Sequence, residues 1–95
     1  MTIKIFGPAI RRPTTSKFYI FDLDGTLTIS RCGKLFSTTA EDTLILSPVN
    51  AKIADLKAEG YNILIVTNQS VFHADTIAKL EMVAAALDVP VLCAA

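Results

Sequence analysis

The sequence predicts an α/β domain built on a parallel sheet, and three observations support this class. Short apolar runs alternate with segments of helical periodicity along the 95 residues. The run at residues 17–21 is apolar on both faces, which is typical of a strand that helices cover on both sides, and residues 61–66 predict a second buried strand. Polar residues follow both runs, where parallel sheets bind their ligands. We therefore expect right-handed helical crossovers and a three-layer α/β/α arrangement.

The N-terminal part predicts an edge strand, a loop and a hairpin in addition to the first buried strand. Residues 2–6 alternate weakly and predict the edge strand, and residues 7–16, which contain two prolines, predict the loop. Residues 28–37 predict a small β-hairpin flap after the first buried strand, with its turn at Cys32-Gly33-Lys34.

Two helices and a further strand are expected in the rest of the chain. Ser47 and Pro48 predict a helix start, with a hydroxyl cap and a proline at the first helical position, and Gly60 predicts its end. A second helix is expected over residues 74–87 and a third strand of the sheet over residues 89–94. The apolar residues of each helix fall on one face: Val49, Ile53 and Leu56 in the first, and Ile77, Leu80, Ala84 and Leu87 in the second.

Composition places the chain among small intracellular domains. Hydrophobic residues make up 52% of a chain long enough for one domain, so we expect residues 1–95 to form one unit with residues 1–16 as an extension. No apolar stretch approaches the roughly 18–20 residues of a membrane span, and no signal-peptide pattern is present, so we expect a protein of the nucleus or cytoplasm without membrane contact. Cys32 and Cys93 are too few for a disulfide framework or a zinc site, and we expect both to be reduced.

The net charge is zero, but basic residues crowd the first 36 positions, where Asp22 and Asp24 are the only acids. This asymmetry has two interpretations. In the first, the basic flank attracts a polyanionic substrate; in the second, it is a solvated surface that happens to be basic. The basic residues are Lys4, Arg11, Arg12, Lys17, Arg31 and Lys34.

Asp22 and Asp24 are the strongest candidates for catalytic residues. Residues two apart in an extended chain lie on the same side, so the two carboxylates can flank one phosphoryl group. One can attack phosphorus, the other can move protons, and both can help to hold a divalent cation. Gly25 allows a turn and a close approach of the backbone to a ligand, and Thr26 can orient Asp24 or cap the turn. The alternatives are an acidic surface turn or a calcium loop, but the residues after Thr26 lack further oxygen ligands for calcium.

Thr67, Asn68 and Gln69 form a second polar group, directly after the strand expected at residues 61–66. Together with backbone N–H groups, such side chains can hold phosphate oxygens without adding charge. Polar turns of this composition are common, so the segment points to a site only in combination with Asp22 on a neighbouring strand.

The two polar segments resemble the first two motifs of the haloacid dehalogenase superfamily, which implies a Rossmann-like parallel sheet. Residues 18–27 (FYIFDLDGTL) are similar to the first motif and residues 65–69 (IVTNQ) to the second. Further positions resemble one branch, the polynucleotide kinase 3′-phosphatases, which act on DNA 3′-phosphate ends in DNA repair: residues 31–36, Asp42, Leu46, and residues 60–61 and 87–91.

The resemblance implies a role for each acidic candidate. Asp22 would be the nucleophile that forms an aspartyl-phosphate. Asp24 would protonate the leaving 3′-oxygen and then activate the water that hydrolyses the intermediate. Mg²⁺ would be the cofactor, bound by the Asp22 carboxylate and the Asp24 main-chain carbonyl.

The resemblance also implies binding residues around these two acids. Thr67 and Asn68, with Gly25 and Thr26 of the turn, would hold the phosphate. Two basic residues of the hairpin would contact the DNA backbone, unless they form only a solvated tip: Arg31 and Lys34.

Two elements of the family are expected downstream of the third strand, whereas this sequence ends at Ala95. They are a lysine that stabilises the phosphoryl charge and an acidic motif that completes the metal site. We expect the later charged residues on or beside the second helix, away from the strand ends, and His73 at a loop or helix cap. These charged residues are Asp75, Lys79, Glu81 and Asp88. We therefore expect a truncated chain with an exposed third strand, weakly active unless a C-terminal segment or a partner chain completes the site.

The leading hypothesis is a Mg²⁺-dependent phosphomonoesterase that removes the 3′-phosphate from DNA ends. Two alternatives stay open. The first is an enzyme that acts on a small sugar or amino-acid-precursor phosphate with the same chemistry. The second is a non-catalytic remnant that binds nucleic acid or a partner through its basic flank.

Overall fold

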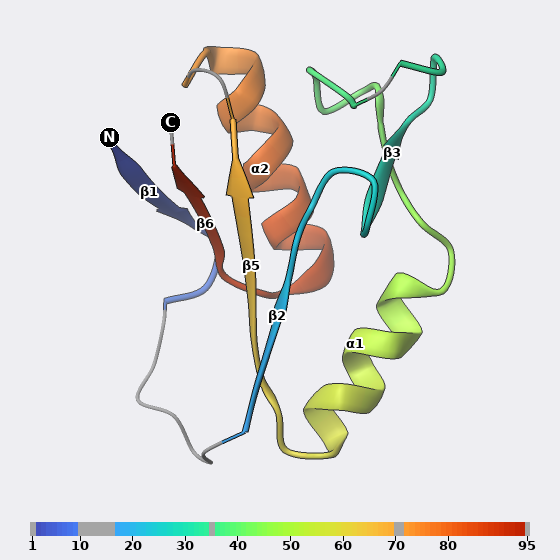
Figure 1. Ribbon diagram of the computed structural model, residues 1–95, viewed down its shortest axis with the longest axis vertical. Coiled ribbons are helices and arrows are strands. Elements are labelled where there is room, and N and C mark those ends of the chain that lie inside the picture. Colours follow the sequence, from blue (N-terminus) through green and yellow to red (C-terminus); the bar gives the residue numbers. More distant parts are fainter. Residues whose placement is uncertain (1, 10–16, 35, 70–71, 95) are drawn as a thin grey trace.

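The computed structural model describes residues 2–9, 17–34, 36–69 and 72–94, and it confirms the α/β class. None of the helices in these ranges is long and apolar enough to cross a membrane. Figure 1 shows the elements, which follow one another in this order: β1 Ile3–Phe6, β2 Phe18–Phe21, β3 Thr28–Ser30, β4 Thr43–Ile45, α1 Val49–Ala58, β5 Asn62–Asn68, α2 Ala74–Leu87 and β6 Val91–Ala94.

The main sheet has four strands in the order β1-β6-β5-β2. β2 runs parallel to β5, with Phe21 opposite Ile65, and β5 runs parallel to β6, with Ile65 opposite Val91. The carboxyl ends of β2 and β5 therefore meet at one edge of the sheet (Figure 1). Ligands of parallel sheets bind at this edge.

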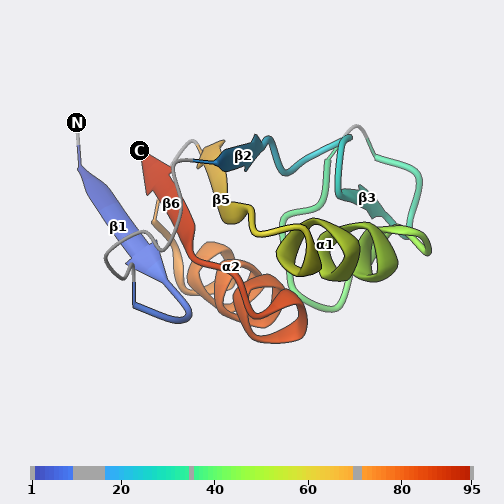
Figure 2. The same cartoon turned by 90° about the horizontal axis from the view of Figure 1, so that it is seen from below.

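Both helices lie on one face of the sheet, so the described residues form two layers and not the three that were expected (Figure 2). The strand order explains this arrangement, because the chain moves in one direction from β2 to β5 to β6, and right-handed crossovers in one direction place their helices on the same face. None of the described helices covers the opposite face. Phe18 and Ile20 of β2 are 49% and 61% exposed, so the prediction that this strand is covered on both faces is wrong for the described part of the chain.

The edge strand expected near the N-terminus is confirmed as β1, which pairs antiparallel with β6. Phe6 faces Val91 across this pair and reaches the core. β1 therefore covers the outer edge of β6, and the expectation of an exposed third strand is wrong. This covering of β6 depends on pairing between the first and last strands of the chain, which a local sequence pattern cannot predict.

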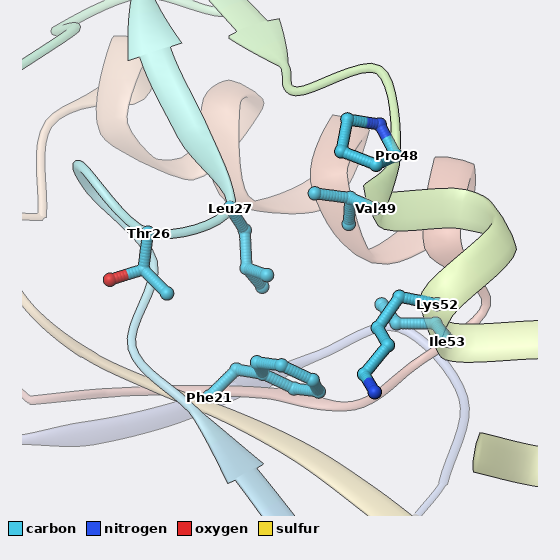
Figure 3. A pocket seen from close by; sticks show the side chains of 7 residues that line it. All are labelled: Phe21, Thr26, Leu27, Pro48, Val49, Lys52 and Ile53. Atoms are coloured by element: carbon cyan, nitrogen blue, oxygen red, sulfur yellow. The ribbon is translucent and has the colours of Figure 1, made fainter. Parts of the chain in front are cut away.

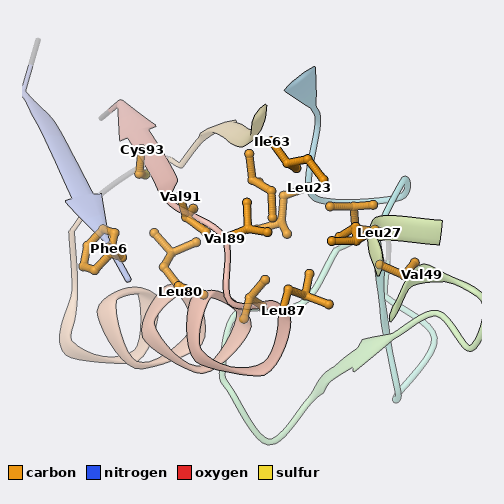
Figure 4. Close-up of a cluster of buried hydrophobic side chains, with 14 of the residues drawn as sticks. Phe6, Leu23, Leu27, Val49, Ile63, Leu80, Leu87, Val89, Val91 and Cys93 are labelled. Atoms are coloured by element: carbon orange, nitrogen blue, oxygen red, sulfur yellow. The ribbon is translucent and has the colours of Figure 1, made fainter. Parts of the chain in front are cut away.

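The core lies between the sheet and the two helices (Figure 4). Leu23, Ile65 and Leu80 are fully buried there, from the turn after β2, from β5 and from α2. The predicted apolar face of α1 is confirmed, since Val49 and Ile53 are buried together with Leu56. This packing fixes α1 and α2 against the sheet.

The helix ends agree with the sequence except at the start of α1. α2 spans the predicted residues, and Gly60 follows the cap residue of α1 with a φ of +90°. At the other end, Pro48 itself is the N-cap residue and no side chain caps the helix. The predicted hydroxyl cap by Ser47 is therefore wrong, because the helix begins one residue later than expected.

The predicted β-hairpin flap is present, but its second strand is β4, further along the chain than expected. The turn predicted at residues 32–34 lies inside the loop of residues 31–42 and does not join the strands directly. Asp42 closes this loop: its carboxylate accepts hydrogen bonds from the Ser30 hydroxyl at 2.6 Å and the Cys32 N–H at 2.9 Å, and its main-chain carbonyl accepts one from the Arg31 N–H at 2.7 Å. The Ser30 hydroxyl is the main reason why the pKa of Asp42 is lowered from its ordinary value.

Candidate active site

The turn after β2 is wound around the carbonyl group of Leu23. This oxygen accepts hydrogen bonds from the N–H groups of Thr26 at 3.2 Å, Leu27 at 2.9 Å and Thr28 at 3.2 Å. Gly25 has a φ of +77°, so the predicted glycine turn is confirmed. A Cβ atom at Gly25 would meet nothing within 4 Å, which leaves open space beside the backbone at this point.

Asp22 is exposed at the start of this turn. Its carboxylate makes no hydrogen bond or ion pair with any other described residue. It follows Phe21 directly, and Phe21 is the last β2 residue paired with β5. Asp22 therefore lies just beyond the last paired residue of β2, and its carboxylate oxygens are available to an electrophile or a cation.

Asp24 differs from Asp22 because protein donors hold both of its carboxylate oxygens. The Gln69 amide donates to Oδ2 at 3.1 Å and also to the Thr67 hydroxyl oxygen at 2.9 Å. Gln69 thus links the residues after β2 to the end of β5. The prediction that the two polar segments meet at one edge of the sheet is confirmed.

Lys79 of α2 holds the other oxygen of Asp24, at 2.7 Å from Nζ to Oδ1. Its ammonium group also donates to the Ser37 carbonyl at 2.8 Å, and the residue is only 1% exposed. The prediction that Lys79 lies away from the strand ends is wrong. One signal was present in the sequence: Lys79 precedes Val83 by four positions and Leu87 by eight, and both of these residues are in the buried stripe of α2.

The remaining phosphate-binding candidates differ in their exposure. Thr67 is 3% exposed, and because its hydroxyl oxygen accepts from Gln69, its own O–H proton stays available for a further acceptor. Asn68 is exposed as the last residue of β5. Thr26 is exposed, and within the described part of the chain its hydroxyl makes no hydrogen bond to Asp24.

A pocket of about 280 Å³ lies beside the turn, between the end of β2 and the start of α1. Figure 3 shows its lining, in which the Thr26 hydroxyl oxygen points away from the other side chains. Most of its wall is apolar, and Lys52 is the one charged side chain in it, so it does not have the donor set of a phosphate site. Its lining residues are Phe21, Thr26, Leu27, Pro48, Val49, Lys52 and Ile53.

The basic residues of the N-terminal flank are distributed over several surfaces. Arg31 and Lys34 are exposed in the flap loop of residues 31–42. Lys4 lies over the ring of Phe72, at 4.8 Å from its centroid, and Lys17 lies near the Tyr61 ring. Arg11 and Arg12 fall outside the described residues.

The other charged candidates on or beside α2 are exposed, as expected. These are Asp75, Glu81 and Asp88, of which Asp88 lies 3.9 Å from Lys57. His73 is the N-cap residue of α2, which confirms its predicted place at a helix cap. Cys32 and Cys93 are free, as predicted, and burial raises the pKa of the Cys93 thiol.

The donor set at the carboxyl edge fits Mg²⁺ only in part. No group of three or more His, Cys, Asp or Glu residues that could hold a metal occurs among the described residues. Asp22 offers a free carboxylate, and the Asp24 carbonyl accepts no backbone hydrogen bond in the same ranges. The Asp24 side chain is occupied by Lys79 and Gln69. Mg²⁺ commonly binds through one or two carboxylates, several waters and a substrate phosphate, so these donors suit a site that the substrate completes.

The chain is similar to one curated protein and to one family of proteins. A curated relative, the bifunctional polynucleotide phosphatase/kinase of Schizosaccharomyces pombe, is 40% identical over 57 residues. This match covers 59% of the chain and 14% of the relative, so the chain corresponds to a small part of that protein. The family profile described as polynucleotide kinase 3 phosphatase matches residues 17–95, from β2 to the end of the chain. The chain therefore belongs to the polynucleotide kinase 3 phosphatase family.

Proposed function

We propose that the chain carries the phosphatase centre of a Mg²⁺-dependent enzyme with a haloacid dehalogenase-like fold, which removes the 3′-phosphate from DNA ends. The observation that carries the proposal is the contrast between two acids two residues apart. Asp22 is exposed with free oxygens, whereas Asp24 is held at both oxygens. A nucleophile must be accessible, and a proton-transfer group must be oriented. Membership of the family supports the choice of a polynucleotide 3′-phosphate as substrate.

The first step is attack by an Asp22 carboxylate oxygen on phosphorus. A bond forms between this oxygen and phosphorus, and the bond from phosphorus to the 3′-oxygen of the DNA breaks. The 3′-oxygen takes its proton from the Asp24 carboxyl group. The product is an aspartyl-phosphate on Asp22 and a DNA end with a 3′-hydroxyl.

The second step is hydrolysis of this intermediate. A water oxygen attacks phosphorus, the bond to Asp22 breaks, and the Asp24 carboxylate accepts the proton of the water. Asp24 is thereby returned to the protonated form that the next turnover uses. The donors on its two oxygens, Gln69 and Lys79, suit the carboxylate form that this second step requires.

Other residues of the edge would bind the phosphate and the cation. The free O–H proton of Thr67 and the exposed Asn68 amide would hold the phosphoryl oxygens. The N–H of Gly25 already donates to the Thr28 carbonyl at 2.8 Å, so Gly25 would contribute the open space that lets the phosphate approach the backbone, with Thr26 beside it. Mg²⁺ held by the Asp22 carboxylate and the Asp24 carbonyl would neutralise charge on the phosphate. With one free carboxylate among the described donors, we expect weak Mg²⁺ binding and low activity unless a further segment or a partner chain adds ligands.

The test is release of phosphate from a 3′-phosphorylated oligonucleotide with Mg²⁺. The wild-type chain is compared with Asp22→Asn and with Asp75→Asn, a matched change of an exposed acid on α2. We expect Asp22→Asn to lose activity by at least about 1,000-fold and Asp75→Asn to keep it. Equal rates for wild type and Asp22→Asn would refute the catalytic proposal and leave a binding module. Equal turnover of a 5′-phosphorylated oligonucleotide or a sugar phosphate would refute the substrate.

A further inference from the structure

We infer that Lys79 is a positioning residue, which orients Asp24 for hydrolysis of the aspartyl-phosphate and ties that orientation to the β3–β4 flap. This inference rests on the proposed function. Lys79 is distinct from the lysine that the family resemblance implies, because that lysine would follow β6 and act on the phosphoryl group. Lys79 stands on α2, and at 1% exposure it has no access to a substrate.

Burial determines what the Lys79 ammonium group must do. A charged group removed from water is costly unless opposite charge and hydrogen bonds compensate it. Of the three N–H donors of Nζ, one goes to Asp24 Oδ1 at 2.7 Å and one to the Ser37 carbonyl at 2.8 Å. The position of the ammonium group is therefore set by two acceptors from different segments of the chain.

The consequence for Asp24 is a fixed carboxylate plane. Lys79 holds Oδ1 and Gln69 holds Oδ2, so rotation of the carboxylate would break one contact or the other. The Asp24 side chain is still 21% exposed, and its oxygens keep lone pairs that these two bonds do not use. It can thus accept a proton from a water molecule in one defined direction.

The second acceptor of Lys79 connects this carboxylate to the flap. Ser37 lies in the loop between β3 and β4, and its hydroxyl accepts a hydrogen bond from Thr43 of β4 at 2.6 Å. Ser37 and Thr43 are 2% and 3% exposed, so water does not compete for these groups. A buried path therefore leads from Asp24 through Lys79 and Ser37 to the base of the flap.

The experiment separates the two chemical steps by trapping the phosphoenzyme in acid after rapid mixing with ³²P-labelled substrate. Lys79→Met removes the charge and keeps a helix-forming side chain that fits an apolar stripe. We expect its hydrolysis step to slow by about 100-fold, because that step uses the Asp24 carboxylate that Lys79 holds. The phosphorylation step uses the protonated Asp24 carboxyl group, which the Lys79 ammonium does not favour, so it should change by less than about fivefold and phosphoenzyme should accumulate. Lys57→Met is the matched control, since Lys57 also contacts an aspartate, Asp88, and it should leave both steps unchanged.

Each outcome of this experiment has a defined meaning. Equal slowing of both steps in Lys79→Met would overturn the inference in favour of a purely structural or charge-stabilising role. Unchanged steps would overturn it as well. A wild-type chain that forms no phosphoenzyme would refute the proposed function and with it the catalytic part of the inference.

A second measurement tests the contact itself and does not depend on activity. The measurement is a double-mutant cycle, in which urea unfolding gives the folding equilibrium constant of wild type, Lys79→Met, Asp24→Asn and the double variant. The factor by which Lys79→Met lowers this constant should be at least about tenfold larger in wild type than in the Asp24→Asn background. Equal effects in both backgrounds would show that the two side chains are not coupled, and would overturn the inference whatever the kinetics.

Discussion

Replacement of Gly7 by alanine should destabilise the fold more than the same change at Gly25, although both glycines have a positive φ, of +87° and +77°. An alanine in the left-handed region costs about 1–2 kcal/mol, and the stiffer unfolded chain returns about 0.4–1 kcal/mol of this. At Gly25 nothing lies within 4 Å of the added Cβ, so we expect a net loss of about 1 kcal/mol in the free energy of unfolding.

Gly7 carries an additional steric term. Its added Cβ would lie 2.6 Å from the Cβ of Ala84 and 3.2 Å from the Val89 carbonyl oxygen. Neither atom belongs to a flexible side chain, and overpacking of this kind costs about 1–3 kcal/mol. The total for Gly7→Ala is then about 3 kcal/mol, or about 2 kcal/mol more than for Gly25→Ala.

Thermal and urea unfolding of the two variants measure this difference. At about 4–8 °C per kcal/mol for a chain of this size, Gly7→Ala should melt about 8–16 °C below Gly25→Ala. The Ala84→Gly background should reduce the difference, because it removes the nearest atom. Equal melting temperatures for the two variants would refute the reasoning, since they would mean that Gly7 does not lie against Ala84 of α2.

Two further predictions concern the flap. Because the Ser30 hydroxyl lowers the pKa of Asp42, Ser30→Ala should move that pKa up towards its ordinary value of 3.8, as measured by NMR titration of the side-chain carboxyl. A depressed pKa stabilises the fold at pH values above the unfolded pKa, which lies near that ordinary value, and the effect is lost as pH falls through the folded pKa. The stability difference between wild type and Ser30→Ala should therefore shrink below about pH 4; a constant difference would contradict the assignment. If Arg31 and Lys34 contact DNA, replacing both by alanine should raise KM for a 3′-phosphorylated oligonucleotide at least about threefold and leave KM for an aryl phosphate unchanged. The rise in KM for the oligonucleotide should be smaller at high salt. An equal rise in KM for both substrates would exclude a contact with the DNA backbone.

Sequence patterns predicted the elements that are determined by residues close together in the chain. α2 was predicted with its observed bounds, because its apolar residues repeat over almost four helical turns. The turn after β2 was also predictable, because Gly25 follows the strand closely and glycine readily adopts the positive φ observed there. The second strand of the flap was misplaced for the opposite reason. Its position depends on Asp42, which bonds to residues ten and twelve positions away, and no local periodicity reports such a contact.

In the candidate site, too, some features could be predicted from the sequence and others could not. Asp22, Asp24 and Thr67 could be recognised from their order along the chain, because parallel strands bring their carboxyl ends together. The bridge that the Gln69 amide makes between Asp24 and Thr67 could not be predicted from the sequence. A glutamine side chain has several rotamers, and only the packing around it selects one.

The position of Lys79 shows that a buried charged residue of the site can be inferred from the geometry of a βα unit. The helix that follows a parallel strand begins at the carboxyl edge of the sheet, and side chains of an α-helix tilt towards its N-terminus. A lysine in the second turn of α2, within the stripe that faces the sheet, is therefore directed back to the edge where Asp24 lies. Interpreting every charge as solvent-facing overlooks this geometry. A cation at a buried helical position requires an anion within reach, and the acid at the end of a neighbouring strand is the partner that this topology provides.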